Sequence, residues 1–184
     1  MNGWIERVVA VVAMGMLGSG TMAAQRLLAK NQLALLPENT PAAMAACGAS
    51  GVTFDVKAAK VPKGAGYPAV EAPPAGKALV YLVTDYADSN TLRMGADGQW
   101  VGALKDGMHL SFVVDPGVRH LCVRTNYSSY READEQWLAL LRLDAVAGKT
   151  YYVAPRARGL LMVDEDEGQM LMQTTEQAVW RVSR

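Results

Sequence analysis

Short apolar runs alternate with turn signals between Lys77 and Thr125, and this alternation is the clearest structural pattern in the chain. Apolar runs of this length, rich in Val, Leu, Tyr and Phe, are typical of β-strands. The Asp-Gly and Asp-Pro-Gly sequences between them favour tight turns, because Gly accepts positive φ and Pro presets φ. The pattern predicts five consecutive antiparallel strands, at residues 77–84, 91–95, 99–104, 108–114 and 118–125. The first of them is an unbroken apolar run, which predicts a strand that is buried on both faces.

The segments on both sides of this stretch extend the β pattern. Short helices are expected near the two ends, at residues 42–46 and 169–177, and residues 178–184 form either a terminal strand or an ordered tail. Loops are expected at residues 60–75, which hold four prolines, and at the polar residues 126–136. Further strands are predicted at residues 52–57, 137–145, 150–155 and 160–163.

Together these elements predict an all-β fold. We expect one antiparallel β-sandwich of about seven to nine strands, Ig-like or transthyretin-like in architecture, with short N- and C-terminal helices. This single domain is expected over residues 46–184. The sequence leaves open whether the sheets pack as a sandwich or close into a partly open barrel.

The start of the chain has the pattern of a secretory signal peptide. Residues 8–17 are apolar, Arg7 precedes them, and Gly and Ser residues interrupt the run before small residues that suit cleavage. Residues 1–24 are therefore predicted to be a signal peptide, and residues 25–45 a segment that is poorly ordered or holds a short helix. An uncleaved tether is the alternative, although the run is shorter than the roughly 20 residues that cross a bilayer. We expect export to the periplasm or cell envelope of a bacterium.

The charge of the chain argues against polyanionic partners. The 184 residues include 18 Lys and Arg and 18 Asp and Glu, so the formal net charge is zero. No basic block stands out, which argues against binding to nucleic acid or to anionic lipid surfaces. The apolar fraction of 51% is enough for a sizeable core.

Several stretches together resemble an uncharacterised bacterial envelope family, domain of unknown function 2846. They are ACGASGVTFDVK (residues 46–57), GKALVYL (76–82), ADGQWVGALKDGMHLSFVVDPGVRHLC (96–122), AVAGKTYYV (145–153) and VDEDEG (163–168). The resemblance covers roughly residues 46–173. It implies an exported, mainly β domain without catalytic residues. Some members look like lipoproteins, but this chain has no lipidation cysteine near its N-terminal apolar segment.

Cys47 and Cys122 are the two cysteines of the chain. An exported protein enters an oxidising compartment, where an even pair of cysteines favours a disulfide. The bond would tie the N-terminal helix to the fifth predicted core strand. The alternatives are two free buried thiols or a metal site, and the absence of CxxC spacing argues against zinc.

Two sets of polar residues are candidates for chemistry. His109 and His120 lie on neighbouring strands of a predicted hairpin around Pro116, where they could face each other and bind a metal or supply a general base. The competing interpretation is that they are ordinary strand histidines, and we favour it. The acidic run at residues 164–167 lacks the spacing of a calcium loop, so we interpret it as a solvated helix start.

Aromatic residues form the third candidate site. Tyr127, Tyr130 and Trp137 lie on a predicted loop and at the start of a strand, where aromatics can stack against a sugar or a peptide. Tyr151 and Tyr152 extend this set, although β-proteins also use such residues in cores and at strand edges. The sequence therefore favours a non-catalytic envelope domain that binds a protein or glycan and needs no cofactor. The alternative is a periplasmic metal-binding protein or enzyme that uses His109 or His120.

Overall fold

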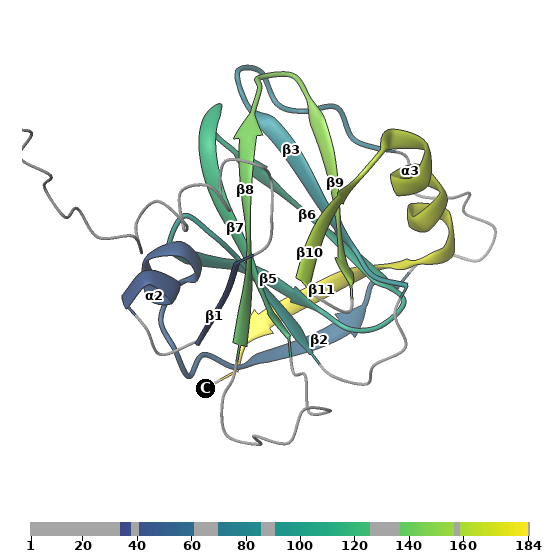
Figure 1. Ribbon diagram of the computed structural model, residues 1–184. Helices are drawn as coiled ribbons and strands as arrows, with labels where there is room; N and C mark the ends of the chain where they lie inside the picture. Colours follow the sequence, from purple (N-terminus) through teal and green to yellow (C-terminus); the bar gives the residue numbers. More distant parts are fainter. Residues whose placement is uncertain are drawn as a thin grey trace, which may run out of the picture.

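The computed structural model describes residues 34–37, 41–60, 70–85, 91–125, 137–156 and 159–183. Most of these residues lie in strands, which form two sheets packed face to face, with one short helix on the outside of each (Figure 1). The predicted all-β sandwich is confirmed. Within these ranges, the structure has no helix that is long and apolar enough to cross a membrane.

The first sheet has five strands in the order β1-β8-β7-β4-β5, and every neighbouring pair is antiparallel. Its longest pairing joins β7 to β8 over their whole lengths, from Gly117 opposite Ala145 to Thr125 opposite Trp137. This pair forms the middle of the sheet. The strands span Ala34–Pro37 (β1), Leu92–Ala96 (β4), Gln99–Leu104 (β5), Gly117–Thr125 (β7) and Trp137–Ala145 (β8).

The second sheet has six strands in the order β10-β9-β3-β6-β11-β2. It is mixed, because β3 pairs with β9 and β6 pairs with β11 in parallel, while the other neighbours are antiparallel. The strands span Phe54–Ala58 (β2), Ala78–Val83 (β3), Met108–Val114 (β6), Thr150–Arg156 (β9), Gly159–Val163 (β10) and Glu176–Val182 (β11).

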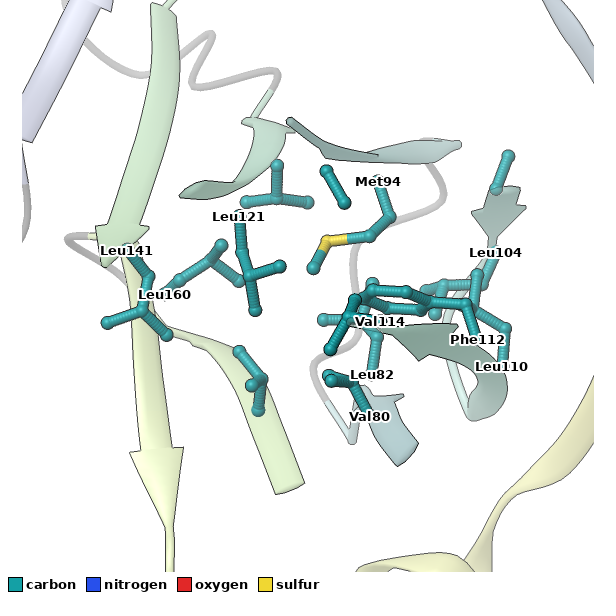
Figure 2. Packing of buried hydrophobic residues seen from close by; sticks show 14 of the residues in the cluster. Val80, Leu82, Met94, Leu104, Leu110, Phe112, Val114, Leu121, Leu141 and Leu160 are labelled. Atoms are coloured by element: carbon teal, nitrogen blue, oxygen red, sulfur yellow. The ribbon is translucent and has the colours of Figure 1, made fainter. Parts of the chain in front are cut away.

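The core lies between the two sheets and follows from the period-2 alternation of each strand. In β6, for example, Leu110, Phe112 and Val114 are buried in the core while Ser111 and Val113 are exposed. Figure 2 shows apolar side chains of the first sheet meeting those of the second. The contacting side chains include Met94, Leu121 and Leu141 from the first sheet and Val80, Leu82, Phe112 and Leu160 from the second.

Each outer sheet face carries a helix, so β3 is buried on both sides as the sequence predicted. Helix α2 (Pro41–Cys47) packs on the first sheet, where Ala46 and Cys47 meet Cys122, Leu138 and Leu140. Helix α3 (Glu165–Thr174) covers β3 and β9 of the second sheet. Its Leu171 and Met172 pack against Leu79, Tyr81, Val83, Tyr152 and Ala154.

The structure differs from the sequence-based expectation in several elements. Ala34–Pro37 forms strand β1 in a segment where no strand was expected, and residues 176–182 form a paired strand, β11. Helix α3 spans Glu165–Thr174 where residues 169–177 were predicted. The expectation that β6 and β7 form a hairpin is wrong, because the turn at Pro116 carries the chain from the second sheet to the first.

Candidate functional site

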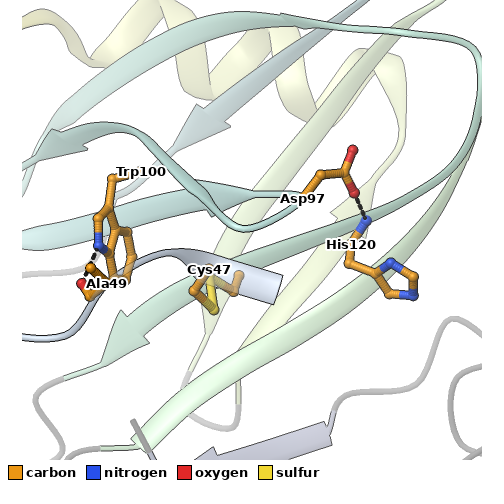
Figure 3. Close-up of a disulfide and its surroundings, with 6 residues drawn as sticks. Cys47, Ala49, Asp97, Trp100 and His120 are labelled. Atoms are coloured by element: carbon orange, nitrogen blue, oxygen red, sulfur yellow. Dashed lines mark hydrogen bonds between the residues drawn. A yellow bond between two sulfur atoms is a disulfide. The ribbon is translucent and has the colours of Figure 1, made fainter. Parts of the chain in front are cut away.

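The Cys47–Cys122 disulfide joins the last residue of α2 to the middle of β7, with a Cα–Cα distance of 5.6 Å. This confirms the predicted pairing. Both cysteines are fully buried in the apolar cluster beneath α2, and Figure 3 shows the bond in its surroundings. A disulfide of this kind is typical of an oxidising, exported location.

Gly95 of β4 makes room for the disulfide. A Cβ atom at this position would lie 2.4 Å from the Cys47 carbonyl oxygen and 2.8 Å from the Cys122 Sγ atom. These distances are shorter than any van der Waals contact. The pairing of β4 with β5 shifts its register between Met94 and Gly95, next to this point. Only glycine therefore lets α2 approach β4 this closely.

The β4–β5 turn holds the end of α2 from the other side. Asp97 and Gly98 have φ values of 47° and 85°, which confirms the tight turn predicted from the Asp-Gly sequence. The Gly98 amide donates to the Ala46 carbonyl at 2.9 Å. The Asp97 carboxylate accepts from the His120 amide at 2.9 Å (Figure 3). It also pairs with Arg119 at 3.1 Å, so the turn is fixed to β7 as well.

Trp100 and Arg93 fasten the chain that leaves α2. The Trp100 Nε1 atom donates to the Ala49 carbonyl at 2.7 Å (Figure 3). The Arg93 guanidinium lies 4.7 Å from the centre of the Trp100 ring and donates to the Val52 carbonyl. We call the disulfide, Gly95, Gly98, Trp100 and Arg93 together the clasp. It holds residues 44–52 against the first sheet, and its two sulfur atoms are bonded to each other, so it offers no reactive thiol.

The two histidines do not form a shared site. His109 lies on β6 and His120 on β7, which belong to different sheets, so the alternative in which they face each other is wrong. His109 is buried beside the C-terminal end of α3, whereas His120 is half-buried in the first sheet next to the Asp97 turn. The described ranges contain no group of three or more His, Cys, Asp or Glu side chains placed to hold a metal ion.

His109 instead fixes the end of α3. Its Nδ1 atom lies 2.9 Å from the Thr175 Oγ1 atom, and the Thr175 hydroxyl donates to the Leu171 carbonyl at 2.9 Å. The Thr175 hydroxyl therefore links the His109 imidazole on β6 to the last turn of α3. Burial lowers the pKa of His109 below its ordinary value of 6.5, and a hydrogen bond to the Thr175 backbone partly offsets this effect.

The lowered pKa of His109 predicts a loss of stability in mild acid. Below about pH 6.5 the unfolded chain binds a proton at His109 that the native protein resists, so the free energy of unfolding falls as pH decreases towards the native pKa. Above pH 6.5 this contribution is fully present. Urea unfolding of wild type and His109→Gln between pH 5 and 8 measures how much His109 contributes to the pH dependence of the free energy of unfolding. The variant should have a flatter pH profile than wild type. An unchanged slope in His109→Gln contradicts the prediction.

The acidic run is the start of helix α3, as the sequence suggested. Asp164 is the N-cap, and its side chain accepts from the Glu167 amide at 2.8 Å. Glu165 accepts from Gln169 at 3.0 Å, and Glu167 pairs with Arg156 at 3.0 Å. These carboxylates therefore stabilise the helix, because negative charges at its N-terminus interact favourably with the positive end of the helix dipole.

The aromatic candidates separate into two groups. Tyr127 and Tyr130 lie outside the described residues, and the side chain of Trp137 does too, although its backbone begins β8 opposite Pro37 and Thr125.

Tyr151 and Tyr152 have structural roles. The Tyr151 hydroxyl accepts from the Val146 amide and donates to the Asp144 carbonyl. The Tyr152 ring stacks on Tyr81 beneath α3, at 5.5 Å between ring centres. Burial raises the pKa of both stacked tyrosines.

Comparisons with known proteins give no match among family models, curated proteins or solved structures. The resemblance to domain of unknown function 2846 therefore stays a prediction.

Sequence reasoning found the disulfide and the Asp-Gly turn of the clasp, but it missed Gly95 and the Arg93–Trp100 contact. The sequence around these residues carried no signal for them, because the need for glycine at position 95 arises only when α2 lies on β4.

Proposed function

We propose that this chain is a non-catalytic, exported domain of the bacterial cell envelope that binds a protein or glycan partner. The observation that carries the proposal is the fully buried disulfide at the centre of the clasp. A covalent bond that holds a helix to the middle of a sheet suits a domain that must persist where no cytoplasmic chaperones act.

The export part of the proposal rests on the apolar segment at residues 8–17 together with the disulfide. We propose that residues 1–24 direct the chain to the periplasm and are removed there. Expression of the full chain in a bacterial host, followed by fractionation and intact-mass measurement, tests this. A periplasmic species that begins at Gln25 supports it. A membrane-bound species of full-length mass supports the uncleaved tether, and a cytoplasmic species contradicts export.

The binding part of the proposal places the partner at the connection between β7 and β8. This connection carries Tyr127 and Tyr130 and ends at Trp137, where β8 begins. Aromatic rings suit both sugar faces and apolar peptide side chains. The alternative function built on His109 and His120 is not proposed, because the two side chains lie on different sheets.

The experiment compares capture from an envelope extract by the oxidised mature domain and by the Tyr130→Ala/Trp137→Ala variant. A matched control is Val118→Ala, which truncates an exposed apolar side chain on β7. A partner or glycan bound by wild type and control but lost by the double variant supports the proposal. Retention by the double variant contradicts the aromatic surface, and no specific capture by wild type contradicts the binding role.

A further inference from the structure

Strand β2 is the last strand of the second sheet, so one of its edges has no neighbour among the strands that the structure describes. Figure 1 shows it running beside β11, and the two strands pair without a register shift over Phe54–Ala58. The strand contains no proline. Unpaired edges of this kind can accept another strand.

The hydrogen-bond pattern fixes which backbone groups of β2 point to the open edge. The Ala59 amide donates to the Gln177 carbonyl, and the Thr53 carbonyl accepts from the Ser183 amide, so residues 53 and 59 bond towards β11. Since bonding alternates along an antiparallel pair, the same holds for residues 55 and 57. The amide and carbonyl groups of Phe54, Val56 and Ala58 therefore point away from β11.

The side chains of β2 show a charge pattern that complements itself. Phe54 and Val56 are buried in the core, while Asp55 and Lys57 are exposed on the outer face of the sheet. In an antiparallel pair of identical strands with a two-fold axis at Val56, Asp55 of each copy lies opposite Lys57 of the other. The backbone groups of Phe54, Val56 and Ala58 then meet their counterparts across the axis.

No neighbouring register both sets opposite charges against each other and brings the edge-facing backbone groups of the two copies together. A shift of one residue sets edge-facing backbone groups against groups already bonded to β11. A shift of two residues sets Asp55 opposite Asp55 or Lys57 opposite Lys57, and like charges directly opposite are destabilising. In the register with the two-fold axis at Val56, Asp55 and Lys57 form non-hydrogen-bonded pairs, whose Cα atoms approach to about 4.5 Å. Their side chains are then at their closest.

The other described sheet ends are less suited to this pairing. Strand β1 ends in Pro37, which lacks an amide donor. On β5, Gly102 lies beneath Trp180 of β11, where an added Cβ would be 2.8 Å from the indole nitrogen. Strand β10 packs against both β7 and β8 of the other sheet, and β2 approaches β5 of that sheet.

We propose that the open edge of β2 binds the same edge of a second copy of this chain, joining two six-stranded sheets across a two-fold axis. The pairing is short, so its interface falls below the roughly 1,200 Å² of stable complexes, and we expect a dissociation constant on the order of tens of micromolar. The carboxylate of Asp55 already accepts from Arg181 at 3.0 Å within its own chain, which holds it in place on the outer face. This inference does not depend on the proposed envelope function.

Charge variants test the register. Sedimentation equilibrium of the oxidised mature chain should show a monomer–dimer equilibrium for wild type. Lys57→Asp alone and Asp55→Lys alone should each weaken association at least tenfold, because each sets like charges opposite across the axis. An equimolar mixture of the two variants should regain association, because every facing pair is then of opposite charge. Lys105→Asp, an exposed lysine in the β5–β6 turn, is the matched control and should associate like wild type.

Cysteine trapping gives a second readout that does not depend on charge. Asp55→Cys and Lys57→Cys proteins should form an intermolecular disulfide rapidly when mixed and slowly when either is oxidised alone. A wild type that stays monomeric up to about 1 mM overturns the proposal. Asp55 and Lys57 would then be charges that keep the edge strand from pairing with other chains. Association of Lys57→Asp with wild-type affinity, or equal trapping in the unmixed samples, also overturns it.

Discussion

Reduction of the Cys47–Cys122 bond is expected to lower the free energy of unfolding by about 4 kcal/mol. The two residues are 75 positions apart, so the bond closes a long loop and removes much of the conformational freedom of the unfolded chain. For a domain of this size, a loss of about 4 kcal/mol lowers the melting temperature by roughly 10 °C. Urea unfolding of the mature chain with and without dithiothreitol measures the effect.

The matched control is the Cys47→Ala/Cys122→Ala variant. Alanine suits the apolar cluster of Ala46, Leu138 and Leu140 better than serine, which would bury a hydroxyl group there. The variant should unfold at the lower midpoint of the reduced wild type and should not respond to dithiothreitol. An equal unfolding midpoint for oxidised and reduced wild type would show that the clasp holds α2 without the covalent bond.

The strands could be predicted from sequence because each carries its own signal. In β6, apolar and polar residues alternate, and one face enters the core while the other stays outside, which is a local property of the strand. The Asp97-Gly98 turn was predictable for a similar reason, since its backbone conformation favours these two residues. The unbroken apolar run of β3 correctly indicated burial on both faces.

The assignment of strands to sheets was not predictable in this way. The Asp115-Pro116-Gly117 turn is compatible both with a hairpin and with a change of sheet, and the contacts that decide between them are distant in sequence. This is why the sequence left open an alternative in which His109 and His120 face each other. Strand β1 was missed because a four-residue strand ending in proline carries little periodic signal.

Most of the candidate site depends on close packing that a single sequence does not reveal. The disulfide could be predicted because an exported chain enters an oxidising compartment, where a pair of cysteines favours a bond. The glycine at position 95 looks in sequence like a residue of an ordinary weak strand, and its reason is the carbonyl of Cys47 beside it. Helix α3 presents the same situation at Gly168, where intrinsic helix propensity and tertiary packing predict opposite effects of a substitution.

Replacing Gly168 by alanine is expected to destabilise the protein by about 3 kcal/mol, although alanine is the better helix former by about 1 kcal/mol. Gly168 is buried in α3 directly over Tyr152 of β9. A Cβ atom there would lie 2.2 Å from the Tyr152 Cγ atom, far inside contact distance. The Tyr152 ring has little freedom to withdraw, because it stacks on Tyr81 at 5.5 Å. The helix must therefore move away, which opens the apolar cluster around Leu171.

Urea unfolding of Gly168→Ala, with Met170→Ala as control, tests this expectation. Met170 is exposed on the same helix, so its truncation should change the free energy of unfolding by less than about 0.5 kcal/mol. Combining Gly168→Ala with Tyr152→Leu in a double-mutant cycle identifies the cause. The smaller side chain should recover part of the loss, giving a favourable coupling energy. If Gly168→Ala unfolds at the wild-type midpoint or above it, helix propensity outweighs the contact, and α3 is not held against β9 as closely as the structure places it.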